Sequence, residues 1–487
     1  MLAWDRATTM PPGGVAARAA AEAELQGLIQ GHRSDPRLMS ALKAAEQEPL
    51  DDLAQADVRE MWRDWHDASS VPPVLAEARV LATARCEFAW REQRARNDWA
   101  GFLGPFREVL RLAREEAARL GEARGLDPYD ALVDRFEPGM DAATLTGLFD
   151  SICGWLPSML AAARVRQGTQ RPPALPGGFP IAAQRALSEA LMDVFGFDRQ
   201  RGRLDSSAHP FTGGVAEDVR ITTRYNPHDP FDSLNSTIHE LGHARYAQGL
   251  PRAWLGRPVG RARSFGIHES QSLSFEMQIA RSAAFASRLA PLLAQHLGPR
   301  PEFESEAVLR RLTWAEPGLI RVAADELSYP LHIVLRFRLE RALISGTLEA
   351  DDLPAAWDEG MAELLDLDTR GNYRDGCLQD IHWSKGAFGY FPSYTLGAVY
   401  AAQWFAALRR DLGPIEDRIA SGDLVPIFDW LESRVWSQAS RWETPELLQR
   451  GTGRRLDAEA FRRHLGERYL GGADDDVRSG DGVGHRP

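Results

Sequence analysis

Apolar residues recur at the spacing of an α-helix along most of the chain, in segments rich in Ala, Leu, Glu and Arg. This pattern predicts a mainly α fold. Breaks that contain proline separate the segments at 11–14, 34–36 and 175–180. The segments with this helical pattern run from Ala16 to Glu46, from Pro72 to Arg96, from Trp99 to Arg124, and with interruptions from Leu234 to about Leu470.

The segment from Gly213 to Tyr225 departs from the helical pattern. Val219, Ile221 and Thr223 alternate there with polar residues, which is the period of a β-strand. We expect this strand at the edge of a small sheet, directly before a helix. An exposed edge can hold an extended peptide by main-chain hydrogen bonds, although an ordinary half-exposed strand fits the pattern equally well.

The length of 487 residues exceeds the size at which one hydrophobic core usually stops growing. Two helical lobes or one large helical domain are expected, and either can enclose a deep cleft. Apolar residues make up 44% and charged residues 26%, as in a soluble globular protein. We expect one domain of two helical lobes around a cleft over residues 1–471, followed by a disordered, Gly-rich tail over 472–487.

Composition and charge exclude several classes of protein. The net charge is -12 and there is no sustained basic stripe, so nucleic acid is not an expected partner. No segment has the length and apolar character of a membrane span, and the N-terminus does not resemble a signal peptide, so we expect a cytoplasmic protein without a membrane partner. Three distant cysteines argue against a disulfide framework and against thiolate ligands, so a metal would need His and carboxylate ligands.

The segment from Pro230 to Pro251 carries the clearest chemical signal. Asp232 or Ser233 can cap the start of a helix there, and glycine and proline close its end. Within this helix, His239, Glu240 and His243 form an HExxH motif. The two histidines project from one face and can share a metal ion, and Glu240 can reach a water molecule bound to that ion.

A third protein ligand must come from elsewhere, because no histidine stands at the spacing HExxHxxGxxH. The segment Ser264–Ser282 begins a second helix and contains two carboxylates, Glu269 and Glu276. We predict Glu269 as the ligand and keep Glu276 as the alternative. The neighbouring His268 is expected to support the site or to be a buried, satisfied histidine.

Five motifs in this order resemble the thermostable carboxypeptidase Taq family of metallocarboxypeptidases, and the likeness covers nearly all of the chain. The stretches 320–337 and 388–397 also look like family segments. The motifs are HPF at 209–211, DVRIT at 218–222, HELGH at 239–243, HESQS at 268–272 and GCLQDIHW at 376–383.

The resemblance implies a cytoplasmic homodimer of largely helical, cleft-containing protomers, similar to neurolysin and angiotensin-converting enzyme. It implies removal of C-terminal residues one at a time from peptides, with broad specificity. The ion would be zinc, replaceable by cobalt, and the third ligand would be Glu269. The segment Ala3–Gly14 looks like a family segment that one more helix normally precedes, so we expect the chain to lack the family's first helix.

The resemblance and the chemistry together suggest roles for further residues. Glu240 would act as general base. Tyr394 or, alternatively, Tyr390 would donate a hydrogen bond to the oxyanion. Arg220 would bind the substrate's terminal carboxylate, unless it only forms an ion pair with Asp218.

Four residues are expected in the cleft wall or behind the ligands: His209, Gln379, Asp380 and His382. Asp380 is a candidate to accept a hydrogen bond from a ligating histidine. Two rival functions remain open at this level, an endopeptidase or oligopeptidase on the same zinc site and a zinc-binding scaffold of low activity.

Overall fold

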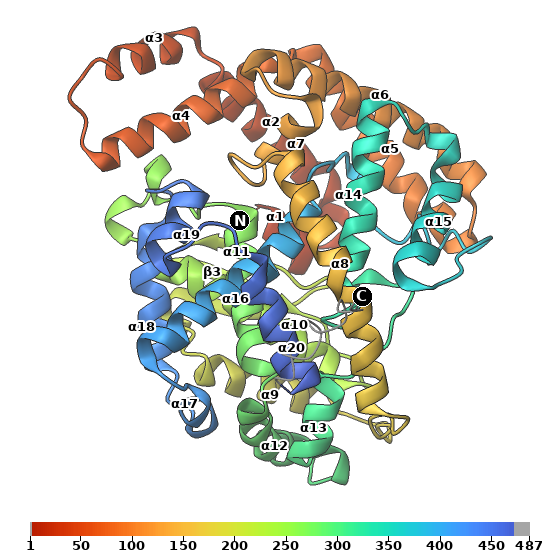
Figure 1. Ribbon diagram of the computed structural model, residues 1–487. Coiled ribbons are helices and arrows are strands. Elements are labelled where there is room, and N and C mark those ends of the chain that lie inside the picture. The colour runs from red at the N-terminus through yellow and green to blue at the C-terminus, as the bar shows by residue number, and fades with distance from the viewer. Residues whose placement is uncertain (1, 472–487) are drawn as a thin grey trace, which may run out of the picture.

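The computed structural model describes residues 2–471 and consists mainly of α-helices, which confirms the fold class predicted from periodicity (Figure 1). The predicted tail at 472–487 lies outside the described residues. Among the described helices, none is both long and apolar enough to cross a bilayer. Cys86, Cys153 and Cys377 form no disulfide and are buried or partly buried, as expected.

The first half of the chain folds as helices that match the expected segments, with one subdivision. The break predicted at 34–36 divides the helical segment from Ala16 to Glu46 into two helices, because Asp35 caps a new helix that starts at Pro36. The helices are α1 (Leu2–Thr8), α2 (Val15–Arg33), α3 (Pro36–Ala45), α4 (Asp52–Ser70), α5 (Pro73–Arg96), α6 (Trp99–Arg124), α7 (Pro128–Asp134), α8 (Ala142–Gln167) and α9 (Ile181–Val194).

The small sheet has three strands in the order β1-β3-β2, with β1 (Gly202–Ser206) parallel to β3 (Asp218–Thr223) and β2 (Thr212–Val215) antiparallel to it. The segment predicted as one strand is therefore the hairpin of β2 and β3. The prediction that this strand lies at a sheet edge is wrong, because β3 is central. The missing partner, β1, is short and half polar, so its sequence does not indicate a strand.

The second half supplies the helices around the centre of the molecule, where α10, α16 and α20 lie in Figure 1. Helix α16 is buried on nearly all sides and packs most extensively on α11. The helices are α10 (Pro230–Gly249), α11 (Phe265–Leu273), α12 (Ala283–Leu297), α13 (Ser305–Leu312), α14 (Tyr329–Ser345), α15 (Leu353–Leu365), α16 (Pro392–Leu412), α17 (Glu416–Ser421), α18 (Val425–Arg434), α19 (Thr444–Thr452) and α20 (Ala458–Leu470).

Two details of these helices bear on the site. Helix α10 starts earlier than predicted, because Asp229 is its N-cap and accepts the N–H of Phe231, with Pro230 as the first helical residue. Helix α11 continues directly into a π-helix at Ser274–Ala280. A π-turn of this length is rare and is often found at functional sites.

Candidate metal centre

His239 and His243 lie one turn apart on α10, with ring centroids 5.0 Å apart, as the HExxH spacing predicts. Their side chains are 24% and 15% exposed, so solvent reaches both rings. Both histidines therefore lie on one partly open face of the helix.

Glu269 approaches the two histidines from α11. Its Oε2 lies 3.5 Å from His243 Nε2, and its Oε1 lies 4.0 Å from His239 Nε2. One ligand atom from each of the three residues lies within 4.8 Å of the others. Two imidazoles and one carboxylate at this separation have the chemistry to hold a divalent metal ion.

Two glycines let Glu269 come this close. A Cβ at Gly397 of α16 would stand 2.5 Å from Cγ of Glu269, and a Cβ at Gly242 of α10 would stand 2.5 Å from the Cα of Ser272. Any side chain at these positions would push α11 away, because real Cβ contacts are longer. The glycine inside HELGH therefore has a packing role beside the ligands.

Glu276 lies behind His239 and contacts its other nitrogen. His239 Nδ1 is 2.8 Å from Glu276 Oε2, and Arg281 Nη2 donates to Glu276 Oε1 at 2.6 Å. A carboxylate in this position fixes the tautomer and orientation of a ligating imidazole. In this structure the partner of His239 is Glu276 and not Asp380, which instead accepts from Arg321 and Arg336.

The charges of this cluster shift its pKa values in opposite directions. Burial alone would lower the pKa of His239, but Glu269, Glu276 and Glu240 raise it to about 10. Burial would raise the pKa of Glu276, but Arg281 and His239 lower it to about 2. Three carboxylates around one imidazole thus create a strongly cation-attracting site.

His243 has its own support in the backbone of α11. Its Nδ1 lies 3.1 Å from the carbonyl oxygen of His268 and 2.7 Å from His268 Nδ1. Burial, with the charge of His243, lowers the pKa of His268 to about 3, so that ring is neutral. His268 thus lies directly against one of the predicted ligands.

Glu240 follows His239 on α10 and is held by the sheet. Its Oε2 accepts a hydrogen bond from the hydroxyl of Thr212 at 2.6 Å. Thr212 lies opposite Ile221 in the register of β2 and β3, on the buried face of the sheet. Sequence reasoning missed Thr212, because only the pairing of two strands brings it to the metal helix.

Tyr394 and Tyr390 lie near Glu269. Burial raises the pKa of both phenols, and the charge of Glu269 adds to this shift in each case. The hydroxyl of Tyr394 is 3.3 Å from His382 Nε2. Burial lowers the pKa of His382 to about 3, so its ring is neutral next to two phenols that stay protonated.

Arg321, which sequence reasoning did not single out, stacks over the ring of Tyr394 at 4.9 Å. It is buried and donates to Asp380 Oδ1 and to the hydroxyl of Tyr329. Gln379 accepts the backbone N–H of Arg321 at 2.8 Å. The predicted wall residues Gln379 and Asp380 thus hold this arginine in place.

Arg220 and His209 lie outside this cluster of contacts. Arg220 donates two hydrogen bonds of 2.9 Å to Asp218, and its guanidinium stacks over Trp4 at 4.6 Å. It alternates with the buried residues of β3, so it lies on the sheet face opposite Thr212. His209 is an exposed residue in the loop between β1 and β2.

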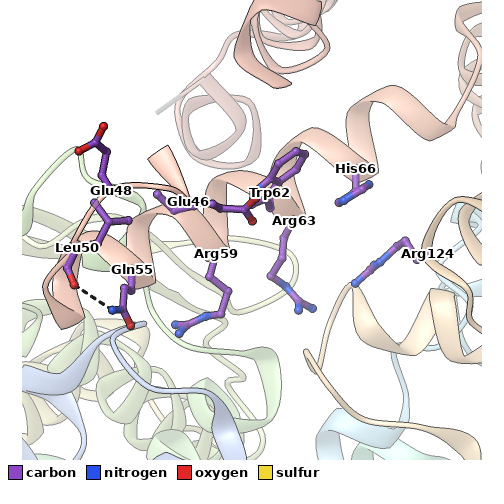
Figure 2. Close-up of a pocket in the computed structure, with 10 residues that line it drawn as sticks. Glu46, Glu48, Leu50, Gln55, Arg59, Trp62, Arg63, His66 and Arg124 are labelled. Carbon is purple, nitrogen blue, oxygen red and sulfur yellow. Dashed lines mark hydrogen bonds between the residues drawn. The ribbon is translucent and has the colours of Figure 1, made fainter. Parts of the chain in front are cut away.

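A cavity of about 490 Å³ lies along α4, and neither His239, His243 nor Glu269 lines it (Figure 2). Figure 2 shows Arg59 and Arg63 extending below the helix, with Arg63 toward Arg124. These cations already have partners, since Arg63 and Arg124 pair with Asp134 and Arg59 donates to a backbone carbonyl. The three arginines that line this cavity are therefore already engaged.

A sequence model of the carboxypeptidase Taq (M32) metallopeptidase family matches residues 1–469. The chain belongs to this family. It is therefore a metallocarboxypeptidase, and the likeness read from the five motifs is confirmed. Among curated relatives, thermostable carboxypeptidase 1 of Thermus thermophilus is 39% identical, and carboxypeptidase 1 of Bacillus subtilis is 30% identical, each over 96% of this chain and 94% of the relative.

Solved structures of M32 enzymes have the same fold. A Trypanosoma cruzi metallocarboxypeptidase 1 superposes with a TM-score of 0.93 at 43% identity, and Pyrococcus furiosus carboxypeptidase with 0.92 at 33%. Each comparison covers 96% of this chain and 95% of the other. The M32 family implies a divalent metal, and His239, His243 and Glu269 have the chemistry to hold it.

Proposed function

We propose that this M32 enzyme is a zinc-dependent carboxypeptidase that releases C-terminal residues from peptides with broad specificity. The observation that carries the proposal is the convergence of His239, His243 and Glu269, with Glu240 next to them on α10. Two imidazoles and one carboxylate suit zinc, and cobalt prefers similar ligands. A divalent ion at these residues would act as a Lewis acid and lower the pKa of a water molecule toward about 7.

Glu240 is the proposed general base. Thr212 occupies its Oε2, which leaves Oε1 to take the proton of the attacking water and return it to the leaving amine. The hydrogen bond from Thr212 fixes the carboxylate before substrate arrives, so little reorganisation is needed. Proton transfer of this kind typically contributes about 100- to 10,000-fold in rate.

Tyr394 is the proposed donor to the oxyanion, with Tyr390 as the alternative. Its contact with His382 orients the hydroxyl, and its raised pKa keeps the proton available for donation. Removing one such donor typically costs about 100- to 1,000-fold in kcat. A Tyr394→Phe variant therefore separates the two phenols.

Arg220 is proposed to bind the terminal carboxylate of the substrate, although it lies on the sheet face opposite Thr212, and His209 is proposed as a residue of the cleft wall. Its bidentate pair with Asp218 has the geometry that a guanidinium uses for any carboxylate, so a substrate would have to displace Asp218. Arg321 is less available for this role, because Asp380 and Tyr329 already take its donors.

Peptides that differ only at the C-terminus test the reaction class. The free-acid peptide should lose its last residue, and the amidated peptide should be cut far more slowly; equal cleavage of both would indicate an endopeptidase. Glu240→Gln should retain zinc and lose most activity. If wild type and variant hydrolyse peptides equally poorly while both hold zinc, the protein is a scaffold and the proposal fails.

We further propose that the enzyme is a homodimer that works in the cytoplasm. Its three unpaired cysteines support this location, because thiols stay reduced in the cytoplasm. The exposed face of α5 supports the dimer, because Val74, Leu81 and Phe88 stand at i, i+7 and i+14 and each is more than half exposed. An antiparallel two-fold pairing centred on Leu81 would set Val74 against Phe88 of the partner subunit. The same axis sets Glu77 against Arg85 of the partner subunit, so the face is self-complementary in charge.

Charge reversal on α5 tests this dimer by light scattering. Glu77→Arg should weaken association, because it places two cations together, and adding Arg85→Glu should restore it. Leu81→Glu should give a monomer. A dimer that survives all of these changes does not use α5.

A further inference from the structure

Phe265 is an exposed aromatic residue at the metal centre. It is the first residue of α11, and 48% of it is accessible to solvent, whereas most of the residues that follow it in the helix are buried. Two other rings pack edge-on against it, Phe136 with a centroid distance of 5.4 Å and Tyr390 also at 5.4 Å. Phe136 and Tyr390 are themselves 5.1 Å apart, so the three rings form one platform.

The platform adjoins the residues that hold the metal. Phe265 stands four positions before Glu269 on α11, so the two side chains share a helix face. Tyr390 packs on Tyr394 at 5.3 Å and on His382 at 5.3 Å, which joins the platform to the proposed oxyanion donor. A substrate whose scissile carbonyl reached the metal would have a side chain within reach of these rings.

The backbone fixes the platform independently of the Phe265 ring. The N–H of Phe265 donates to the carbonyl of Phe136 at 3.0 Å. The buried carboxylate of Glu137 accepts from the N–H of Gly266 and from the hydroxyl of Ser264, the N-cap of α11. The ring is therefore not needed to anchor the helix, and its exposure costs hydrophobic free energy unless a ligand covers it.

We propose that Phe265, Phe136 and Tyr390 form a subsite that binds an apolar or aromatic side chain of the peptide, next to the scissile bond. The inference rests on the proposed carboxypeptidase function and names the class of side chain that the enzyme favours. An apolar side chain would cover the exposed ring and gain edge-to-face contacts with the aromatic faces. Phe265 is thus a specificity-determining residue.

The test compares Phe265→Ala with wild type on free-acid peptides in which one residue varies among Ala, Leu, Phe and Lys. One series varies the terminal residue and a second varies the residue before it. In one of the two series, the wild type should favour Phe and Leu over Ala, and the variant should lose about tenfold or more of that preference in kcat/KM. Activity on the Ala peptide should change little, and Phe265→Tyr should keep the preference.

A binding measurement separates recognition from catalysis. Calorimetry compares the Glu240→Gln protein with the Glu240→Gln/Phe265→Ala protein. The double variant should bind the Phe peptide more weakly than the single variant and should bind the Ala peptide equally well. Val165→Ala on α8, where the side chain is 83% exposed, is the control and should change the binding of neither peptide.

The proposal is overturned if Phe265→Ala lowers kcat/KM equally for all side chains, or leaves the preference within twofold in both series. It is also overturned if wild type cleaves the Ala peptide but has no preference for apolar side chains. Absence of any cleavage of free-acid peptides by wild type would instead refute the proposed function.

Discussion

Replacing Glu276 with glutamine tests whether the carboxylate behind His239 sets the affinity of the metal site. In the wild type, Oε2 of Glu276 contacts His239 Nδ1 at 2.8 Å, and Oε1 accepts from Arg281 at 2.6 Å. Glutamine has nearly the same shape but only one carbonyl oxygen, so it can accept from only one of the two donors. His239 therefore loses either its fixed orientation or the negative charge that strengthens it as a ligand.

For the loss of metal affinity in Glu276→Gln, the structure favours the upper part of the usual range. Supporting carboxylates typically contribute about 10- to 100-fold in metal affinity, or about 1.4–2.7 kcal/mol. Glu276 and Arg281 are each only 15% exposed, so water and salt screen this pair little. We expect Glu276→Gln to weaken zinc binding by roughly 30- to 100-fold.

Competition with a fluorescent zinc chelator at neutral pH measures this change directly. Glu306→Gln is the matched control, because its carboxylate is 86% exposed and forms only a surface pair with Arg310. Circular dichroism should show the same helix content in all three proteins. A change in zinc affinity below threefold for Glu276→Gln would refute the argument that this carboxylate supports the ligand.

Three further substitutions test the packing, the pH dependence and the substrate contact. Gly397→Ala should lower metal content and kcat/KM, because its Cβ would stand 2.5 Å from Cγ of Glu269. Gly147→Ala is the control and should preserve both, because the space around its Cβ is open. Equal behaviour of the two variants would contradict the packing role of Gly397. Burial raises the pKa of Glu340 from 4.5 to about 7, although hydrogen bonds oppose the shift. The contribution of the protonated Glu340 to the free energy of unfolding is therefore fully present below pH 4.5. It falls by up to about 1.4 kcal/mol per pH unit as the pH rises toward 7. Glu340→Gln should flatten the fall of the unfolding free energy in urea over that window, and an unchanged slope would rule the group out. Arg220→Ala should raise KM far more for free-acid peptides than for amidated peptides. An equal rise for both would show that Arg220 does not bind the terminal carboxylate.

The residues of the metal centre that sequence analysis brought together are those whose placement is local. His239 and His243 share a helix face because helical periodicity requires it, and the motif on the next helix supplies Glu269. Helix α10 starts three or four residues before the predicted caps Asp232 and Ser233, since Pro230 pre-organises the first turn and Asp229 caps it.

The contacts that sequence analysis missed depend on tertiary packing. Thr212 reaches Glu240 only through the pairing of β2 with β3, and the central position of β3 depends on the unpredicted β1. Glu276 is one of the two carboxylates that the sequence offers as a ligand, but its contact with His239 joins the π-helix to α10 across 37 residues, which apolar periodicity does not reveal. Asp380 is only a candidate partner of a ligating histidine in the sequence, whereas in the structure two arginines distant in sequence take both of its oxygens.

The π-helix at Ser274–Ala280 limits the insertions and deletions that this region can accept during evolution. Glu269 and Glu276 face different nitrogens of one imidazole, and the wide turn helps to set the angle between them. Deleting one residue between the two glutamates would shift Glu276 by one position, or about 100° around the helix axis. Selection should therefore act on the length of this segment as well as on its side chains, and relatives should keep the spacing of the two glutamates even where their loops differ in length.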